Sequence, residues 1–386
     1  MAKRKNSSRH GHSGDPRKRA AEEESQAQAE ATPELEDEVG AALEAGHPID
    51  IMMLASSLIA GLDPDARTPD DVAAGQLPPP EEFVRMFLDA KDQRLHVLAW
   101  TVARLLPDSQ LHRAVDAALG PDTVPGWLVP LAAAEVVAAW QTTDPLRDST
   151  DIVISLRVGE ADLTVIGLVD FNSDGALKDG FVVPAPLSAV QEALSASGET
   201  GMEAWELAPA DARSWLVEAI AVGRTAEPRF ESDSWPQARP LVEWALRLCP
   251  PGGTGWVRPE WGPEDIESVV AEFAAAPEGA VVADPADRAV LVDALHGLAR
   301  DTSADPLLIS GVRIELGLGY LWPTTLHHDL DPLLALPDLL GPYVRWAHGR
   351  RGIPADDTDQ ALAAVAHFRA AYARDVTEAN ADDHSP

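Results

Sequence analysis

DIVISLRVGEADLTVIGLVDFNSDGALKDGFVVP, residues 151–184, is the part of this sequence that predicts a β-sheet most clearly. From Ile152 to Val158 apolar side chains occupy every second position, which is typical of a strand with one buried face. Leu163–Val169 is apolar on both faces, as in a central strand, and Phe181–Val183 is a third short strand. We therefore expect a small antiparallel β-unit at about 151–184.

Helical periodicity dominates on both sides of this unit. Ile51, Leu54, Leu58 and Leu62 share one helical face, and shorter helices are expected between Pro80 and Gly120. Further helical patterns occur at 187–194, 212–223, 241–248, 266–273, 285–298 and 362–372. The predicted fold class is α+β: mostly helical, with the β-unit flanked by helical regions.

One segment departs from the helical pattern. Val312, Ile314, Leu316, Leu318 and Tyr320 alternate with other residues, which favours a strand over a helix.

The domain organisation follows from changes in composition. A stretch rich in Pro, Gly and Trp at 250–263 separates two folded parts. We expect five units: a disordered tail at 1–45, a helical domain at 46–145, an α+β region at 146–250, a helical C-terminal domain at 251–378 and a disordered end at 379–386.

Charge limits the possible partners. The 386 residues include 63 Asp and Glu against 30 Lys and Arg, which gives a net charge of −33. Such a charge repels nucleic-acid phosphates and anionic membranes from the folded body. Cys249 is the only cysteine, so the chain forms no internal disulfide and no cysteine-rich zinc site. We expect a cytoplasmic protein without a membrane segment or a cofactor.

The first 19 residues have the opposite charge. They contain seven basic residues against one acidic residue, and eight acids follow by residue 38. Neither stretch has an apolar period, so both are expected to be disordered. Residues 1–19 could make weak, sequence-independent contact with nucleic acid, or could remain solvated without a partner.

Asp170-Phe171-Asn172-Ser173-Asp174-Gly175 matches the first six positions of a calcium-binding loop. Asp170, Asn172 and Asp174 would supply oxygen ligands. The twelfth position is Phe181 instead of the expected Glu, and a strand precedes the run instead of a helix. The preferred interpretation is a tight turn between strands, with a metal loop as the alternative.

Asp170, Lys178 and Asp179 could also form an acid–base cluster at the rim of the sheet. No nucleophile accompanies them in the sequence, so ion pairing at the rim is the preferred interpretation.

Two other polar groups are candidates for sites. Arg345, His348, Arg350 and Arg351 could bind an anion, but the preferred interpretation is that they lie at a helix C-terminus, where cations interact favourably with the helix dipole. His327, His328 and Asp331 are metal-ligand types, but adjacent His side chains point apart. Most of the eleven Trp residues are expected in cores, and Trp256 and Trp261 are the best candidates for an exposed contact.

Several stretches resemble a family of large uncharacterised actinobacterial proteins that carry a basic N-terminal tail. These stretches are 47–58, Val169-Asp170, 178–184, 235–244, 258–261, 336–340 and 345–348. The resemblance covers about residues 45–375. It departs at 170–175, which that family usually lacks, and at 321–328, where this chain has Trp322-Pro323 and a His pair. The function of the family is unknown, so the resemblance implies extent and not activity.

Three functions stay open. The first is a non-enzymatic interaction or regulatory protein, with a protein as partner, that joins an acidic body to a basic tail. The second is an enzyme with a site near Asp170, Lys178 and Asp179. The third is a calcium-dependent module that uses Asp170, Asn172 and Asp174. Phosphate-loop, dinucleotide-binding, zinc-protease and serine-hydrolase motifs do not occur in the sequence.

Overall fold

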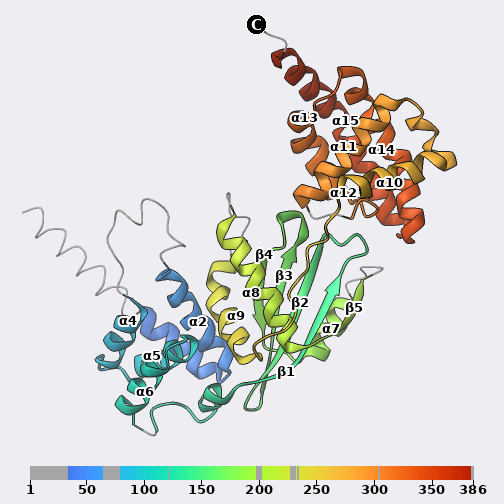
Figure 1. Ribbon diagram of the computed structural model, residues 1–386. Helices are drawn as coiled ribbons and strands as arrows, with labels where there is room; N and C mark the ends of the chain where they lie inside the picture. Colours follow the sequence, from blue (N-terminus) through green and yellow to red (C-terminus); the bar gives the residue numbers. More distant parts are fainter. Residues whose placement is uncertain are drawn as a thin grey trace, which may run out of the picture.

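The computed structural model describes residues 34–63, 79–120, 122–196, 202–226, 232, 234–302 and 305–383. Within these residues the fold is α+β and mostly helical, with one five-stranded antiparallel sheet. Figure 1 shows the sheet in the middle, with one group of helices beside it and a second group beyond the ends of its strands. The predicted fold class is confirmed.

The strand order of the sheet is β4-β3-β2-β1-β5. The strands are β1 (Glu135–Thr143), β2 (Ser149–Val158), β3 (Ala161–Asp170), β4 (Ala176–Val183) and β5 (Glu203–Leu207). Neighbouring strands are antiparallel, and a bulge falls between Leu168 and Val169 of β3.

The three expected strands are confirmed as parts of β2, β3 and β4, but the expected three-stranded unit is too small. β1 begins at Glu135, before the boundary predicted at residue 145, and β5 is an additional edge strand. β1 lacks a simple alternation because its last three residues, Gln141, Thr142 and Thr143, are polar and all buried. β5 is short and mostly exposed, as edge strands often are.

The N-terminal helices share one hydrophobic core with the sheet, from Val39 to Cys249. They are α2 (Pro48–Gly61), α4 (Pro80–Leu88), α5 (Gln93–Leu105) and α6 (Ser109–Ala118). Residues 34–45 are also helical, which corrects the prediction of disorder up to residue 45. Leu35, Val39 and Leu43 recur every four residues, so this acidic segment presents an apolar face, and Val39 is fully buried.

Two helices cover the face of the sheet that belongs to this core: α8 (Pro209–Thr225) and α9 (Trp235–Leu248). α2 packs on α9, which contains Pro240 in its interior. The Ser56 hydroxyl donates to the Gln237 carbonyl (2.6 Å) and accepts from the Leu241 amide (3.2 Å). Ser56 thereby links the Gln237 carbonyl to the Leu241 amide beside Pro240, which has no amide hydrogen to donate within the helix. α7 (Leu187–Ala196) packs on the opposite face.

A second core begins after residues 250–262 and runs from Ile266 to Val376. Its helices are α10 (Pro263–Ala275), α11 (Pro285–Thr302), α12 (Gly311–Leu316), α13 (Trp322–Thr325), α14 (Leu330–Arg351) and α15 (Ala355–Asp383). α15 continues through 379–383, which were expected to be disordered, because each added helical residue completes one more backbone hydrogen bond.

The strand expected over 312–320 is wrong. α12 occupies its first half, and η5 (Gly317–Leu321), a π-helical turn, occupies the second. Ile314 and Leu318 are four residues apart and fully buried, whereas Val312 and Tyr320 are 49% and 66% exposed. The alternation therefore coincides with a helical face.

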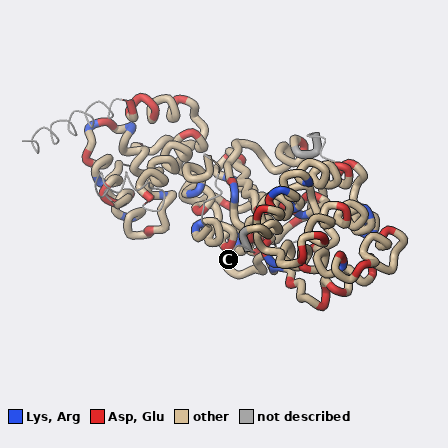
Figure 2. Tube along the Cα trace, turned by 90° about the horizontal axis from the view of Figure 1, so that it is seen from above, with Lys and Arg blue, Asp and Glu red and all other residues tan. Residues whose placement is uncertain are grey.

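Acidic side chains are spread over both parts of the molecule. Figure 2 shows Asp and Glu along both groups of helices, with fewer Lys and Arg between them. No helix among the described residues combines the length and the apolar character that crossing a membrane requires.

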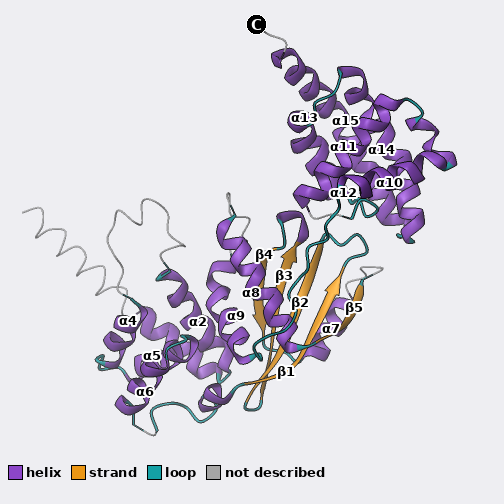
Figure 3. Cartoon of the chain, viewed as in Figure 1, coloured by secondary structure: helices purple, strands orange, loops and turns teal. Residues whose placement is uncertain are grey.

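The linker at 250–262 runs along the sheet before it enters the second core, and Figure 3 shows it as loop. Gly253 has a φ of 96°, and a Cβ there would lie 2.4 Å from the Ala210 backbone. The Thr254 amide donates to the Asp211 carboxylate of α8 at 2.6 Å. These contacts hold the linker against α8 and bring Trp256 to the end of the sheet.

Candidate functional site

The turn between β3 and β4 contains the sequence predicted as a calcium-loop candidate. The Asp170 carboxylate accepts from the Asn172 amide (2.8 Å) and the Ser173 hydroxyl (3.2 Å). Asn172 donates to Asp148 (3.1 Å), and Asp174 pairs with Arg258 at 2.6 Å. The three proposed ligands thus face different protein partners. No cluster of three metal-ligating residues occurs among the described residues.

The predicted acid–base cluster is only partly assembled. Lys178 Nζ lies 3.4 Å from Asp170, and the Lys178 side chain is about half exposed. Asp179 instead accepts from the Gly180 amide (2.8 Å) and the Ser232 hydroxyl (2.6 Å), just before α9. None of the three residues lines either pocket described below.

The predicted anion-binding residues on α14 do not converge. His348 is buried, where it contacts the Thr358 hydroxyl (2.9 Å) and the Ile309 carbonyl (3.1 Å). Arg350 pairs with Glu272, Arg351 pairs with Asp305, and Arg345 is exposed. His328 pairs with Asp293 at 2.7 Å and not with Asp331.

A pocket of about 440 Å³ lies where the end of the sheet meets the second core. Its volume is within the range of roughly 300–1,000 Å³ that is usual for small-molecule sites. Five aromatic residues line it: Phe171, Trp205, Trp215, Trp256 and Trp261. The other lining residues are Gln141, Thr143, Leu146, Arg147, Val257, Pro259, Asp305, Leu308 and Arg313.

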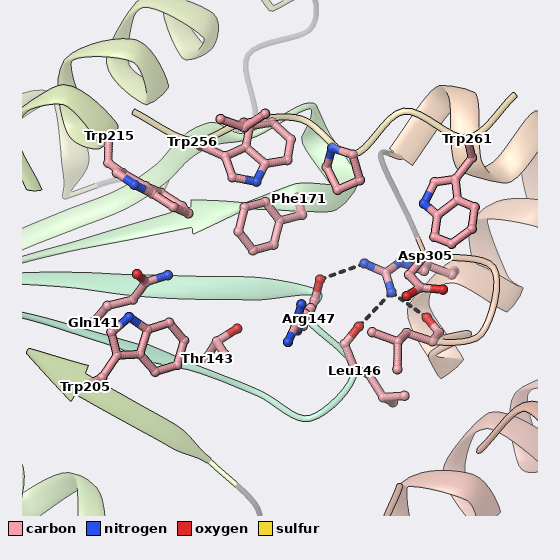
Figure 4. A pocket seen from close by; sticks show the side chains of 14 residues that line it. Gln141, Thr143, Leu146, Arg147, Phe171, Trp205, Trp215, Trp256, Trp261 and Asp305 are labelled. Atoms are coloured by element: carbon pink, nitrogen blue, oxygen red, sulfur yellow. Dashed lines mark hydrogen bonds between the residues drawn. The ribbon is translucent and has the colours of Figure 1, made fainter. Parts of the chain in front are cut away.

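The aromatic walls come from four segments: the turn after β3, β5, α8 and the linker. Pairing of Gln141 in β1 with Trp205 in β5 forms one wall. On the other side, the Phe171 ring lies 5.0 Å from Trp256 of the linker and 6.2 Å from Trp215 of α8. Figure 4 shows Trp215, Trp256 and Phe171 together, with Trp205 and Gln141 opposite them.

Gly175 determines where Trp256 can lie. Gly175 has a φ of 76°, and a Cβ there would lie 2.7 Å from the Trp256 ring. Glycine is the residue that adopts this left-handed conformation without strain and leaves room for the ring. The turn at 170–175 therefore shapes the pocket wall through Gly175, and its candidate calcium ligands do not line the pocket.

Arg313 holds the inner end of the pocket in place. Its side chain is 1% exposed and donates to the carbonyls of Leu146 (2.7 Å), Arg147 (2.7 Å) and Leu308. Its Nε donates to Asn172 (3.0 Å) and lies 3.4 Å from Asp148. Burial lowers the pKa of Arg313 and raises the pKa of Asp148, so pairing between them offsets part of the cost of desolvation.

Arg147 belongs to the turn between β1 and β2 and has a φ of 55°, which is unusual for a residue other than glycine. Its carbonyl accepts from Arg313, and its amide donates to the Asp144 carbonyl at 3.1 Å. The Asp144 carboxylate accepts from the amides of Leu146, Asp148 and Ser149. The backbone of this turn is thus fixed by hydrogen bonds on both sides.

The Arg147 side chain has no such partners. Within the described part of the chain, no carboxylate lies within ion-pair distance of its guanidinium, and no acceptor is hydrogen-bonded to it. Trp261 is similar, because its indole Nε1 is buried and has no hydrogen-bond acceptor among the described residues. Two lining residues of the pocket, Arg147 and Trp261, therefore carry donors that the described protein groups leave unpaired.

A second, more polar pocket of about 370 Å³ adjoins the first. Arg147, Asp305 and Leu308 line both pockets. The charge of Asp305 is balanced there, because its carboxylate accepts from the Leu307 amide (2.9 Å) and pairs with Arg351.

Comparison with family models, with curated proteins and with solved structures gave no match to this chain. The description of the site therefore rests on the residues of this chain alone. The sequence identified Trp256 and Trp261 as contact candidates, but it did not identify Arg147, Trp205 or Trp215. The one available signal for Arg147 was a charged residue in the short Asp144–Asp148 connection between two strands.

Proposed function

We propose that this protein is a non-enzymatic binding protein whose ligand occupies the aromatic pocket between the sheet and the second core. The observation that carries this proposal is the convergence of five aromatic side chains around one pocket, two of whose lining residues carry unpaired donors. Small-molecule sites usually combine apolar walls with a few polar groups that orient the ligand.

The polar groups of the pocket favour binding over catalysis. The Thr143 hydroxyl donates to the Ser149 carbonyl at 2.8 Å, and no carboxylate or imidazole of the described residues is hydrogen-bonded to it. Cys249 is not a pocket residue, and burial raises the pKa of its thiol to about 11. The carboxylates of Asp148 and Asp305 are paired with arginines. The pocket thus offers contacts to a ligand but no activated nucleophile among its lining residues.

A regulatory role is consistent with the position of the pocket. Its lining residues come from the sheet, from the linker and, through Asp305, Leu308 and Arg313, from the second core. A bound ligand would contact both sides and stabilise their present arrangement by mass action. Residues 1–19 lie outside the described residues, so nucleic-acid contact by the tail, like a protein partner and a cytoplasmic location, stays a prediction.

The test is a screen of small aromatic and aliphatic compounds by saturation-transfer NMR on the full chain. We expect selective binding of aromatic compounds that Trp205→Ala weakens about tenfold or more. Tyr320→Ala is the matched control, because Tyr320 is an exposed aromatic outside the pocket. Equal binding by both variants, or a chemically altered ligand after incubation, would overturn the proposal.

A further inference from the structure

We infer that the ligand is a planar aromatic anion, with its ring between the Trp walls and its carboxylate on Arg147. This inference rests on the proposed function and deepens it by naming the class of ligand. The first argument is the composition of the pocket walls, because five aromatic side chains line it beside the three aliphatic side chains of Leu146, Val257 and Leu308. Flat rings favour stacked or edge-to-face contact with another flat ring.

The second argument is the balance of donors and acceptors at the inner end. The Arg313 guanidinium donates to three carbonyls and to Asn172, and is paired with Asp148. Asp305 is occupied by Arg351 and by the Leu307 amide. After these pairings, Arg147 is the charged side chain of the pocket without a partner among the described residues. The Arg147 side chain is exposed to solvent, so a ligand that replaces its water contacts must supply acceptors, and a carboxylate matches the guanidinium fork.

The third argument is Trp261. Figure 4 shows its nitrogen on the edge of the ring that faces the other lining residues. A buried donor without an acceptor costs stability, and a ligand acceptor would remove that cost once the indole ring turns its closed-off Nε1 toward the pocket. An ammonium group has only donors and a positive charge. It would therefore leave the donors of Arg147 and Trp261 without an acceptor.

The backbone of Arg147 supports the same assignment. A left-handed conformation is unfavourable for arginine, yet Asp144 and Arg313 hold the residue in it. Strained residues that the surrounding structure fixes in this way cluster at binding sites. In a chain with a net charge of −33, an anion needs a local cation to be retained.

The experiment is isothermal titration calorimetry of the full chain with four probes. The probes are 2-naphthylacetate, 2-naphthylethanol, 2-naphthylethylammonium and cyclohexylacetate. We expect naphthylacetate to bind about tenfold more tightly than the neutral alcohol, and the ammonium and the aliphatic acid to bind more weakly than naphthylacetate. Added salt should weaken the binding of naphthylacetate and leave the binding of the alcohol unchanged.

In Arg147→Gln, naphthylacetate and the alcohol should bind with about the same affinity, because the cation is lost. The naphthyl ring should still bind. The matched control is Arg345→Gln, which removes an exposed arginine that lines neither pocket. If the three naphthyl probes bind equally, or the ammonium binds best, the anion inference is wrong while the binding pocket stands. If no naphthyl probe binds, or binding is unchanged by Trp205→Ala, the proposed function fails as well.

Discussion

The turn between β1 and β2 and the turn between β3 and β4 lie at the same end of the sheet, and both contact Arg313. The turn at 170–175 has the more suggestive sequence, but its polar side chains are paired within the protein. The turn at 144–148 matches no motif, yet its Arg147 side chain lines the pocket. Among the described residues, Arg147 has no ion-pair partner. Polar residues that suggest chemistry in a sequence are often consumed by folding, so a binding site is better located by the donors that remain unpaired.

The largest effect should come from the residue that ties the two turns together. Arg313→Met removes four hydrogen-bond donations and leaves Asp148 buried without its cation. Breaking a buried pair on one side costs about 3–5 kcal/mol of unfolding free energy. Urea unfolding followed by tryptophan fluorescence measures this loss. Arg345→Met should change stability by less than about 0.5 kcal/mol, and a similar loss in both variants would contradict a joining role for Arg313.

Gly175→Ala tests whether the turn at 170–175 acts as a wall of the pocket. The added methyl group meets the Trp256 ring and also faces a φ of 76°. We expect a loss of about 1–3 kcal/mol in unfolding free energy and weaker binding of aromatic probes. Gly46→Ala is the control, because Gly46 has a φ of 70° but no atom within 4 Å of the added Cβ. That variant should lose stability from backbone strain alone and keep its affinity for the probes.

The elements that could be predicted from the sequence are those whose partners lie close to them along the chain. Strands β2, β3 and β4 are connected by short turns, so alternation within 151–184 was enough to predict them. β5 pairs with β1 across about sixty residues, and that pairing brings Trp205 beside Gln141. No local pattern contains such a contact. Trp256 and Trp261 were recognised because they occur in a Pro/Gly-rich segment, but their neighbours in the pocket depend on tertiary packing.

His348 provides a smaller, pH-dependent effect in the second core. The Ile309 carbonyl can only accept, so Nε2 donates to it, and Nδ1 of the neutral ring lies 2.9 Å from the Thr358 hydroxyl, which donates to the Pro354 carbonyl. Burial lowers the pKa of His348 below its usual value of 6.5. The unfolded chain therefore binds a proton that the folded chain does not, and stability falls as the pH drops from about 6.5 toward the folded-state pKa.

This single group contributes at most about 1.4 kcal/mol per pH unit. The measurement is urea unfolding of the native chain and of His348→Gln between pH 7.5 and 5.5. The variant should be less stable at pH 7.5 and show a shallower decrease toward pH 5.5. Parallel curves would show that His348 does not titrate differently in the folded and unfolded chains.

The smallest expected effect on stability distinguishes the two turns most sharply. In Arg147→Gly the left-handed backbone no longer carries a side chain, which removes a penalty of about 1–2 kcal/mol. Glycine also makes the unfolded chain more flexible, which costs about 0.5–1 kcal/mol. The guanidinium has no protein partner to lose among the described residues. The unfolding free energy should therefore stay unchanged or rise by about 1 kcal/mol, while the preference for carboxylate probes disappears.

Arginine at this position then reduces stability for the sake of binding, as strained site residues do. A clear loss of stability in Arg147→Gly would mean that the side chain supports the fold, and the contrast between the two turns would no longer hold.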